Sequence, residues 1–184
     1  MPLAEEAWLG AAILAPRGKV LEDGRPRFFR RIARGEFDTE DLCARSAELA
    51  QFIRDACRTY GIGRPIAVGH SNGANIAWSV LFRQPNVLAG AILIRPFMAA
   101  DPRPVENLRG LPILVLSGAS DSIVPFSAVT ELVELCRESG GKVSHHMVKG
   151  DHDIVPDDRL AISEWLRRTH RIAEEAARLQ SPDG

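Results

Sequence analysis

A glycine-flanked serine between an apolar run and a helical stretch constrains the fold of this chain more than any other feature. The pentapeptide at 69–73 reads Gly-His-Ser-Asn-Gly, with a short apolar run at 65–68 before it and a helical pattern at 72–83 after it. Glycines beside the serine permit a turn so tight that larger side chains would collide there. We therefore predict a strand–turn–helix unit that exposes the Ser71 hydroxyl at a helix N-terminus. The alternative is a glycine-rich turn in which Ser71 only caps the helix.

Apolar runs and helical stretches alternate along the chain. The predicted strands, together with the one at 65–68, lie at 11–15, 89–94, 111–116 and 142–148. The predicted helices lie at 38–60, 72–83 and 126–139, and from about 156 onward. Runs that are apolar throughout are typical of parallel strands covered on both faces. We therefore predict a single α/β domain over 1–184, with a mostly parallel sheet of about five strands, a long ordered loop at 17–37 and a frayed tail at 179–184.

Composition excludes several classes of function. The net charge is −1, so the chain lacks the basic excess expected of a nucleic-acid or anionic-membrane binder. No apolar run approaches the roughly 20 residues that span a bilayer, and the acidic N-terminus does not resemble a signal peptide, which predicts a cytoplasmic protein. The three cysteines have no metal-ligand spacing, so neither a metal nor a cofactor is expected. The absence of a G-x-G-x-x-G or Walker pattern argues against nucleotide binding.

Two further residues have the positions expected of a general base and its orienting acid. A serine hydroxyl is a weak nucleophile at neutral pH, so it needs both. Asp121 follows the apolar run at 111–116, and His152 follows the predicted strand at 142–148. The carboxyl ends of parallel strands meet at one edge of a sheet, so Ser71, Asp121 and His152 are expected on the same rim. We predict that these three residues form a catalytic triad.

Alternatives remain for the acid. Asp121 could serve only as a cap for the helix that begins after it. Asp151 or Asp153 could orient His152 instead, although neighbouring residues in a chain rarely reach around to the ring. Asp121 is therefore the preferred partner of His152.

The chain resembles a known group, the small single-domain carboxylesterase/phospholipase-type α/β-hydrolases, including bacterial esterases related to dienelactone hydrolases. The residues that carry the resemblance, over about 1–168, are those at 15–18, 27–31, 37–38, 69–75 and 116–118, with Asp121, Pro125, Gly150 and His152. The resemblance implies an α/β-hydrolase fold and cleavage of small carboxylic esters, including aromatic esters and thioesters, through an acyl-enzyme. Dienelactone hydrolases proper use a cysteine nucleophile, so the serine at position 71 favours esterase chemistry.

Four residues are expected to line the substrate pocket. The resemblance implies that the loop around Phe28 and Phe29 walls the pocket. His70, next to the nucleophile, is expected at its floor, and Arg95, directly after the apolar run at 89–94, is also assigned to it. The expected partner is a small-molecule ester.

One part of the expected machinery has no counterpart in the sequence. The backbone N–H of Asn72 can supply one oxyanion donor, but the second usually comes from a loop marked by His-Gly after an earlier strand, and no such segment precedes residue 11. We therefore expect an N-terminally truncated fold, and loss of one donor typically costs about 10²–10³-fold in rate. The missing strand would lie between those at 11–15 and 65–68. The alternative function is a non-catalytic module that forms homo-oligomers through the open sheet edge.

Overall fold

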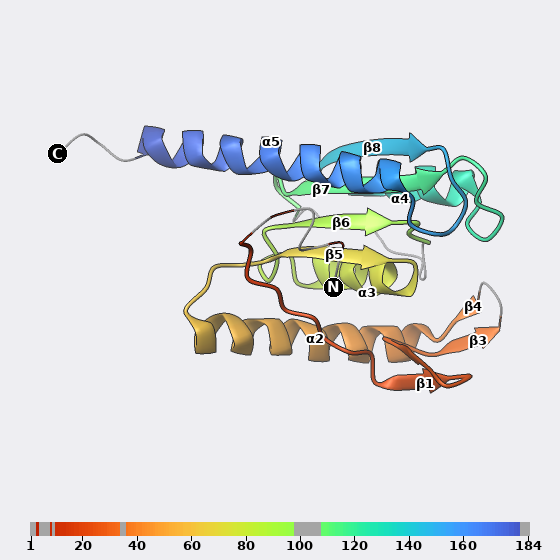
Figure 1. Cartoon of the computed structure of the whole chain (residues 1–184). Helices are drawn as coiled ribbons and strands as arrows, with labels where there is room; N and C mark the ends of the chain where they lie inside the picture. The colour runs from red at the N-terminus through yellow and green to blue at the C-terminus, as the bar shows by residue number, and fades with distance from the viewer. Residues whose placement is uncertain (1–2, 4–7, 9, 34–35, 98–107, 181–184) are drawn as a thin grey trace.

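A four-stranded parallel sheet with the strand order β5-β6-β7-β8 forms the centre of the molecule (Figure 1). The computed structural model describes residues 3, 8, 10–33, 36–97 and 108–180. The sheet strands are β5 (Ile66–His70), β6 (Gly90–Ile94), β7 (Pro112–Gly118) and β8 (Lys142–Val148). The helices around the sheet are α2 (Thr39–Tyr60), α3 (Asn72–Arg83), α4 (Phe126–Glu138) and α5 (Pro156–Gln180).

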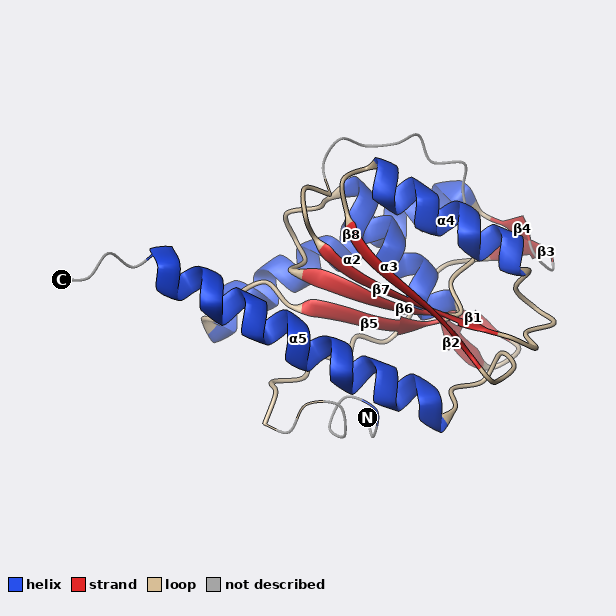
Figure 2. Ribbon diagram, turned by 90° about the horizontal axis from the view of Figure 1, so that it is seen from above, coloured by secondary structure: helices blue, strands red, loops and turns tan. Residues whose placement is uncertain are grey.

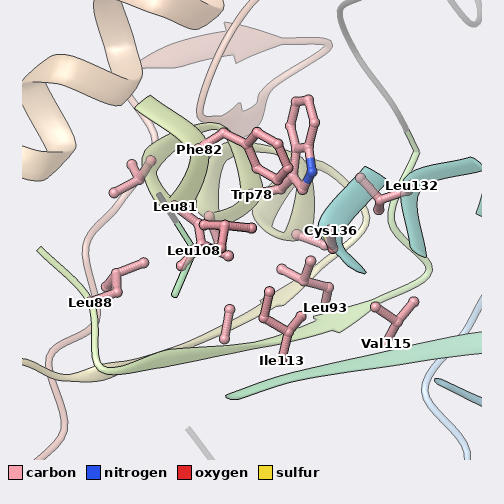
Figure 3. Close-up of a cluster of buried hydrophobic side chains, with 14 of the residues drawn as sticks. Trp78, Leu81, Phe82, Leu88, Leu93, Leu108, Ile113, Val115, Leu132 and Cys136 are labelled. Atoms are coloured by element: carbon pink, nitrogen blue, oxygen red, sulfur yellow. The ribbon is translucent and has the colours of Figure 1, made fainter. Parts of the chain in front are cut away.

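The helices cover both faces of the sheet. Figure 2 shows α2, α3 and α4 on one side and α5 on the other. Successive strand residues alternate between the two sides: Leu93 and Val115 pack in the core that contains Trp78 of α3 (Figure 3), whereas Ile92 packs with Trp165 of α5. All five residues of β6 are buried as a result. Coverage on both faces explains why the central strands β6 and β7 are largely apolar rather than alternating, whereas the edge strand β8 carries polar residues.

The ends of α2 follow the signals in the sequence. Asp38 precedes the helix, and its carboxylate accepts a hydrogen bond from the Asp41 N–H at 2.9 Å. Gly61 ends the helix in the left-handed conformation, with φ of 62°. A side chain at φ > 0 is strained, whereas glycine is not, so Gly61 provides the stop that was predicted for this helix.

The fifth strand predicted for the sheet, at 11–15, is wrong. This segment is irregular, and Ile13 and Leu14 are partly exposed. A strand needs a hydrogen-bonded neighbour, and within the described residues β5 pairs with β6 on one edge and with no strand on the other. A groove of about 1740 Å³ runs beside that free edge, lined by residues 11–16, 64–70, 72 and 73 and by parts of α2, α3 and α5. We call it the β5 groove.

The segment predicted as a long loop, 17–37, is ordered as expected but contains two small antiparallel hairpins. The first pairs β1 (Val20–Glu22) with β2 (Arg25–Arg27), and the second pairs β3 (Arg31–Ala33) with β4 (Glu36–Phe37). The proline-rich segment at 95–109 is expected to be irregular, but its residues 98–107 lie outside the described residues, as does most of the tail, 181–184. Helix α5 continues to Gln180, so the chain is still helical where fraying was predicted to begin. No helix among the described residues is long and apolar enough to cross a membrane.

Candidate active site

Ser71 lies in a strained turn between β5 and α3. Its backbone angles are φ 52° and ψ −114°, a conformation that side-chain-bearing residues rarely adopt. A Cβ atom at Gly69 would lie 2.3 Å from the carbonyl oxygen of Gly73, so position 69 requires glycine. A Cβ at Gly73 would meet only Phe28, at 3.8 Å, so that second glycine is not sterically required. The turn therefore depends on one of its two flanking glycines.

The structure brings together the three residues predicted as a triad. The Nε2 atom of His152 lies 2.9 Å from the Ser71 hydroxyl, and its Nδ1 atom lies 3.0 Å from Oδ2 of Asp121. With the proton on Nδ1, the ring donates to Asp121 and accepts from the serine hydroxyl, which is the tautomer a general base requires. The side chain of His152 is 19% exposed and that of Asp121 is 2% exposed. The imidazole is therefore accessible to small molecules, while the carboxylate is screened from water.

Asp121 is held as a carboxylate by donors on both of its oxygens. Its Oδ1 accepts from the backbone N–H groups of Ile123 and Val124, at 2.8 and 2.9 Å. Burial would raise the pKa of Asp121, but the Val124 N–H, the His152 ring and the Ile123 N–H outweigh it, so the pKa lies below its ordinary value. The competing acid Asp151 instead accepts from the Asp153 N–H. Asp121 thus forms a local turn through Oδ1 and contacts His152 through Oδ2, but it does not cap α4, which is preceded by Pro125.

Two residues predicted to line the substrate pocket do not do so. Phe29 is fully buried and packs with Leu42 and Ile76, because the backbone after Phe28 turns that side chain toward α2 and α3. Arg95 is also fully buried, and its guanidinium pairs with the carboxylate of Asp158 at 2.8 and 2.9 Å. Both predictions are therefore wrong.

The other two predicted pocket residues border the β5 groove beside the serine. Phe28 lies against Gly73, and His70 precedes Ser71, with its ring 5.2 Å from that of His152. Burial lowers the pKa of His70 below its ordinary value, because this effect and the charges of His152 and Arg95 outweigh a hydrogen bond that raises it.

The comparisons with known proteins agree on one family. No protein-family model matches the chain. It is 40% identical over 159 residues to the "Putative hydrolase MhqD" of Bacillus subtilis (strain 168), a match that covers 85% of this chain and 80% of that protein. The crystal structure of the Bacillus cereus carboxylesterase is 38% identical with a TM-score of 0.88, covering 91% of this chain and 80% of that one. The carboxylesterase from Mesorhizobium loti is 30% identical with a TM-score of 0.86, covering 90% and 80%. The chain belongs to the carboxylesterase-type α/β-hydrolases.

Membership of this carboxylesterase-type family confirms the fold that the resemblance implied. The parallel sheet and its flanking helices are the α/β-hydrolase core, with four strands in the described sheet rather than about five. Ser71, Asp121 and His152 follow the carboxyl ends of β5, β7 and β8, so all three lie at the same edge of the sheet.

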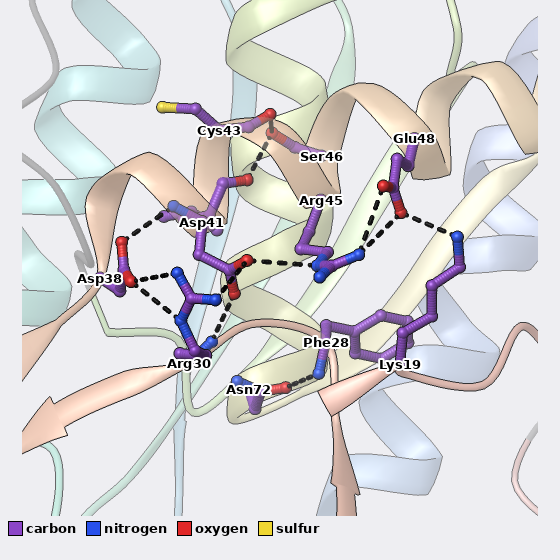
Figure 4. Close-up of polar contacts among 11 residues, drawn as sticks. Lys19, Phe28, Arg30, Asp38, Asp41, Cys43, Arg45, Ser46, Glu48 and Asn72 are labelled. Atoms are coloured by element: carbon purple, nitrogen blue, oxygen red, sulfur yellow. Dashed lines mark hydrogen bonds and ion pairs between the residues drawn. The ribbon is translucent and has the colours of Figure 1, made fainter. Parts of the chain in front are cut away.

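The oxyanion side of this carboxylesterase-type site contains a feature that the sequence did not reveal. The Asn72 N–H belongs to the first turn of α3, where backbone N–H groups have no partner within the helix. The side chain of Asn72 accepts the Phe28 N–H through Oδ1 at 2.7 Å (Figure 4). Its buried Nδ2 has no partner among the described residues. Nothing in the sequence distinguishes an anchoring asparagine at this position from an exposed one.

A polar network holds the loop that carries Phe28 against α2 (Figure 4). The carboxylate of Asp41 accepts the backbone N–H of Arg30 at 2.8 Å and the Nε of Arg45 at 3.3 Å. Arg30 also pairs with Asp38 at 2.7 Å. Asp41 is buried at the start of α2, so these contacts fix the backbone beside Phe28 and hence the position of that ring near the serine.

Proposed function

We propose that the chain hydrolyses small carboxylic esters, with Ser71 as nucleophile, His152 as general base and Asp121 as the orienting acid. The observation that carries the proposal is the continuous hydrogen-bonded series Ser71–His152–Asp121, at 2.9 and 3.0 Å. The carboxylesterases among the structural relatives support the choice of ester substrates.

The reaction proceeds in two steps through an acyl-enzyme. Ser71 Oγ attacks the ester carbonyl carbon while its proton passes to Nε2 of His152, and the resulting imidazolium is stabilised by Asp121. The tetrahedral intermediate collapses, the C–O bond to the alcohol breaks, and the leaving alcohol takes the proton from His152. Water then attacks the acyl-serine with His152 again as base, which releases the carboxylic acid and regenerates the Ser71 hydroxyl.

The oxyanion of the tetrahedral intermediate needs hydrogen-bond donors beside Ser71. The Asn72 N–H lies at the start of α3, where the helix dipole also favours negative charge. Removal of one oxyanion donor costs about 10²–10³-fold in other serine hydrolases. We expect the Asn72 N–H to be one of the donors to the oxyanion.

A fluorophosphonate probe and an activated ester test this proposal together. We expect the probe to label Ser71, as located by peptide mass spectrometry, and p-nitrophenyl acetate to be hydrolysed. Ser71→Ala should abolish both signals, whereas Ser120→Ala, in the turn after β7, should retain them. Absence of labelling in folded protein would contradict the proposal.

A second candidate function is self-association through the free edge of β5. Within the described residues this edge has no strand partner, and Val68 in the middle of β5 is 44% exposed. Free edges bind further strands, and a homo-oligomer would cover this one. We expect light scattering to detect an oligomer that Val68→Lys converts to a monomer. A wild-type chain that stays monomeric at all concentrations would contradict this candidate.

A further inference from the structure

Three consecutive backbone carbonyl groups around His152 each accept a hydrogen bond from a side chain at the end of a sheet strand. Nε of Arg95 donates to the carbonyl of Asp151 at 2.7 Å, and Nη2 of Arg95 donates to that of Asp153 at 3.1 Å. The carbonyl of His152 itself accepts from Nε2 of His70 at 2.7 Å. A loop bonded in this way at three successive residues has little freedom to shift.

Arg95 is suited to hold these carbonyl groups because its own side chain is buried and fixed by an ion pair. It directly follows β6, its backbone has φ of 50°, and its side chain is fully buried. The bidentate pair with Asp158 fixes the plane of the guanidinium, and Asp158 also accepts the Val155 N–H at 2.9 Å. The loop 150–155 is therefore attached to the end of β6 and to the first turn of α5 at once.

His70 links the base to the nucleophile through one short piece of backbone. It is the last residue of β5 and precedes Ser71. The hydrogen bond from the His70 ring to the His152 carbonyl therefore fixes the position of His152 relative to the serine hydroxyl, because His70 and Ser71 are adjacent in the chain.

The backbone around this loop is packed so closely that one strand end requires glycine. A Cβ at Gly118, the last residue of β7, would lie 2.3 Å from the Asp151 carbonyl oxygen and 2.9 Å from Nε of Arg95. The Asp151 carbonyl thus lies between Gly118 and Arg95, and the loop cannot approach the sheet more closely.

We propose that Arg95, together with Asp158 and His70, positions the catalytic histidine by holding the carbonyls of residues 151–153. We call this set the histidine clamp. The inference rests on the proposed function of His152 as the base. None of the three side chains has to touch the substrate, so each acts as a positioning residue. A displacement of about 1 Å in such a group costs roughly 10²-fold in rate.

The first test removes the buried ion pair as a unit. In Arg95→Met/Asp158→Leu no charge is left unpaired in the interior, and apolar replacements of buried ion pairs are often neutral for stability. We expect kcat for p-nitrophenyl acetate to fall about 10²-fold while KM stays within about threefold, because the loss concerns the base and not substrate binding. The control is Ser79→Ala, which removes a buried hydroxyl that donates to Ser46 on α2, and it should leave kcat unchanged. Unchanged kcat in the folded double variant would overturn the role of Arg95.

The second test asks whether the hydrogen bond of His70 or merely its bulk matters. Gln carries an N–H donor near the place of Nε2, whereas Leu carries none. We expect His70→Gln to retain at least about a third of kcat and His70→Leu to lose about tenfold, with similar unfolding temperatures for the two. Equal kcat in the Gln and Leu variants would remove His70 from the clamp.

A readout independent of turnover separates this inference from the proposed function. In NMR spectra of the imidazole groups, the Nδ1–H of His152 should give a low-field signal that is absent in His152→Ala. We expect that signal to broaden or vanish in Arg95→Met/Asp158→Leu. If the wild-type protein shows the signal but hydrolyses no ester, the proposed function fails and the clamp stands. If the signal persists in the folded double variant, the clamp fails.

Discussion

The two sides of Ser71 differ in packing: one side provides buried, hydrogen-bonded partners, and the other borders an open groove. On the acid–base side, the partners that follow β6 and β7 are buried: Asp121 is 2% exposed, and the ion pair of Arg95 with Asp158 of α5 is fully buried. On the β5 side, a groove of about 1740 Å³ runs beside the residues that flank the serine, and it is larger than the roughly 300–1000 Å³ of ordinary ligand sites. The lining of that groove includes the two neighbours of the serine, His70 and Asn72, but not Ser71 itself.

This difference separates two requirements of ester hydrolysis. In the function proposed above, activation of Ser71 depends on the acid–base side, where His152 and Asp121 are hydrogen-bonded to it in series. On the β5 side, the Asn72 side chain anchors the loop that carries Phe28 through Oδ1, and its buried Nδ2 has no partner among the described residues. We therefore expect substitutions on the acid–base side to lower kcat more than substitutions in the groove.

The largest effect, a loss of kcat, is expected for Asp121→Asn on the acid–base side. The substitution removes the carboxylate that selects the tautomer of His152, and the corresponding change in another serine hydrolase lowers kcat about 10⁴-fold. We expect a loss of that order in steady-state hydrolysis of p-nitrophenyl acetate, with KM little changed. A loss below tenfold would mean that the acid–base side does not limit the chemistry.

The next largest effect is a loss of stability, expected when a tightly packed glycine, Gly118, is replaced and compared with the more loosely packed Gly73. Gly118→Ala places a methyl group against backbone at 2.3 Å, so we expect the free energy of unfolding to fall by about 2 kcal/mol or more. In Gly73→Ala the nearest atom lies at 3.8 Å, and the change should stay within about 1 kcal/mol. Urea denaturation measures both variants. Equal losses would show that the β5 side is packed as tightly as the other.

A smaller effect concerns the pH dependence of stability through His70, which lies at the boundary between the sides. Its folded pKa lies below the ordinary value because of burial, so the unfolded chain binds more protons as the pH falls below about 6.5. The wild-type protein should therefore lose stability as the pH falls from that value toward the folded pKa. We expect the unfolding temperature of His70→Gln to fall less steeply between pH 7 and 5. Parallel curves would contradict the assignment.

The smallest effect is expected for Phe28→Ala in the open groove. Phe28 is partly exposed, and its backbone stays anchored by Asn72, so the variant loses only contacts of the ring. We expect KM for aromatic esters to rise about 2- to 10-fold with kcat within about threefold. A fall in kcat as large as that of the Asp121 variant would mean that the two sides are coupled.

Residues whose conformation depends on their near neighbours were predictable. The helix bounded by Asp38 and Gly61 begins and ends where the capping residues indicated. The turn at Ser71 follows the predicted strand–turn–helix order. The positions of Ser71, Asp121 and His152, each after one of the parallel strands, also predicted that the three would lie on one rim, because parallel strands end on the same edge. These features depend on local sterics, on capping and on the regularity of a parallel sheet.

The tertiary structure decided what depends on partners distant in the chain. The apolar run at 11–15 has the composition of a strand, but a strand requires a hydrogen-bonded neighbour, and this segment is irregular. Phe29 and Arg95 were predicted to line the pocket and are instead fully buried, one among side chains of α2 and α3 and the other against Asp158. The sequence by itself determined the fold class and the residues brought to the rim around Ser71. Only the packing of distant segments determined that His70 and Arg95 are hydrogen-bonded to the loop of His152, whereas the other edge of β5 borders a groove.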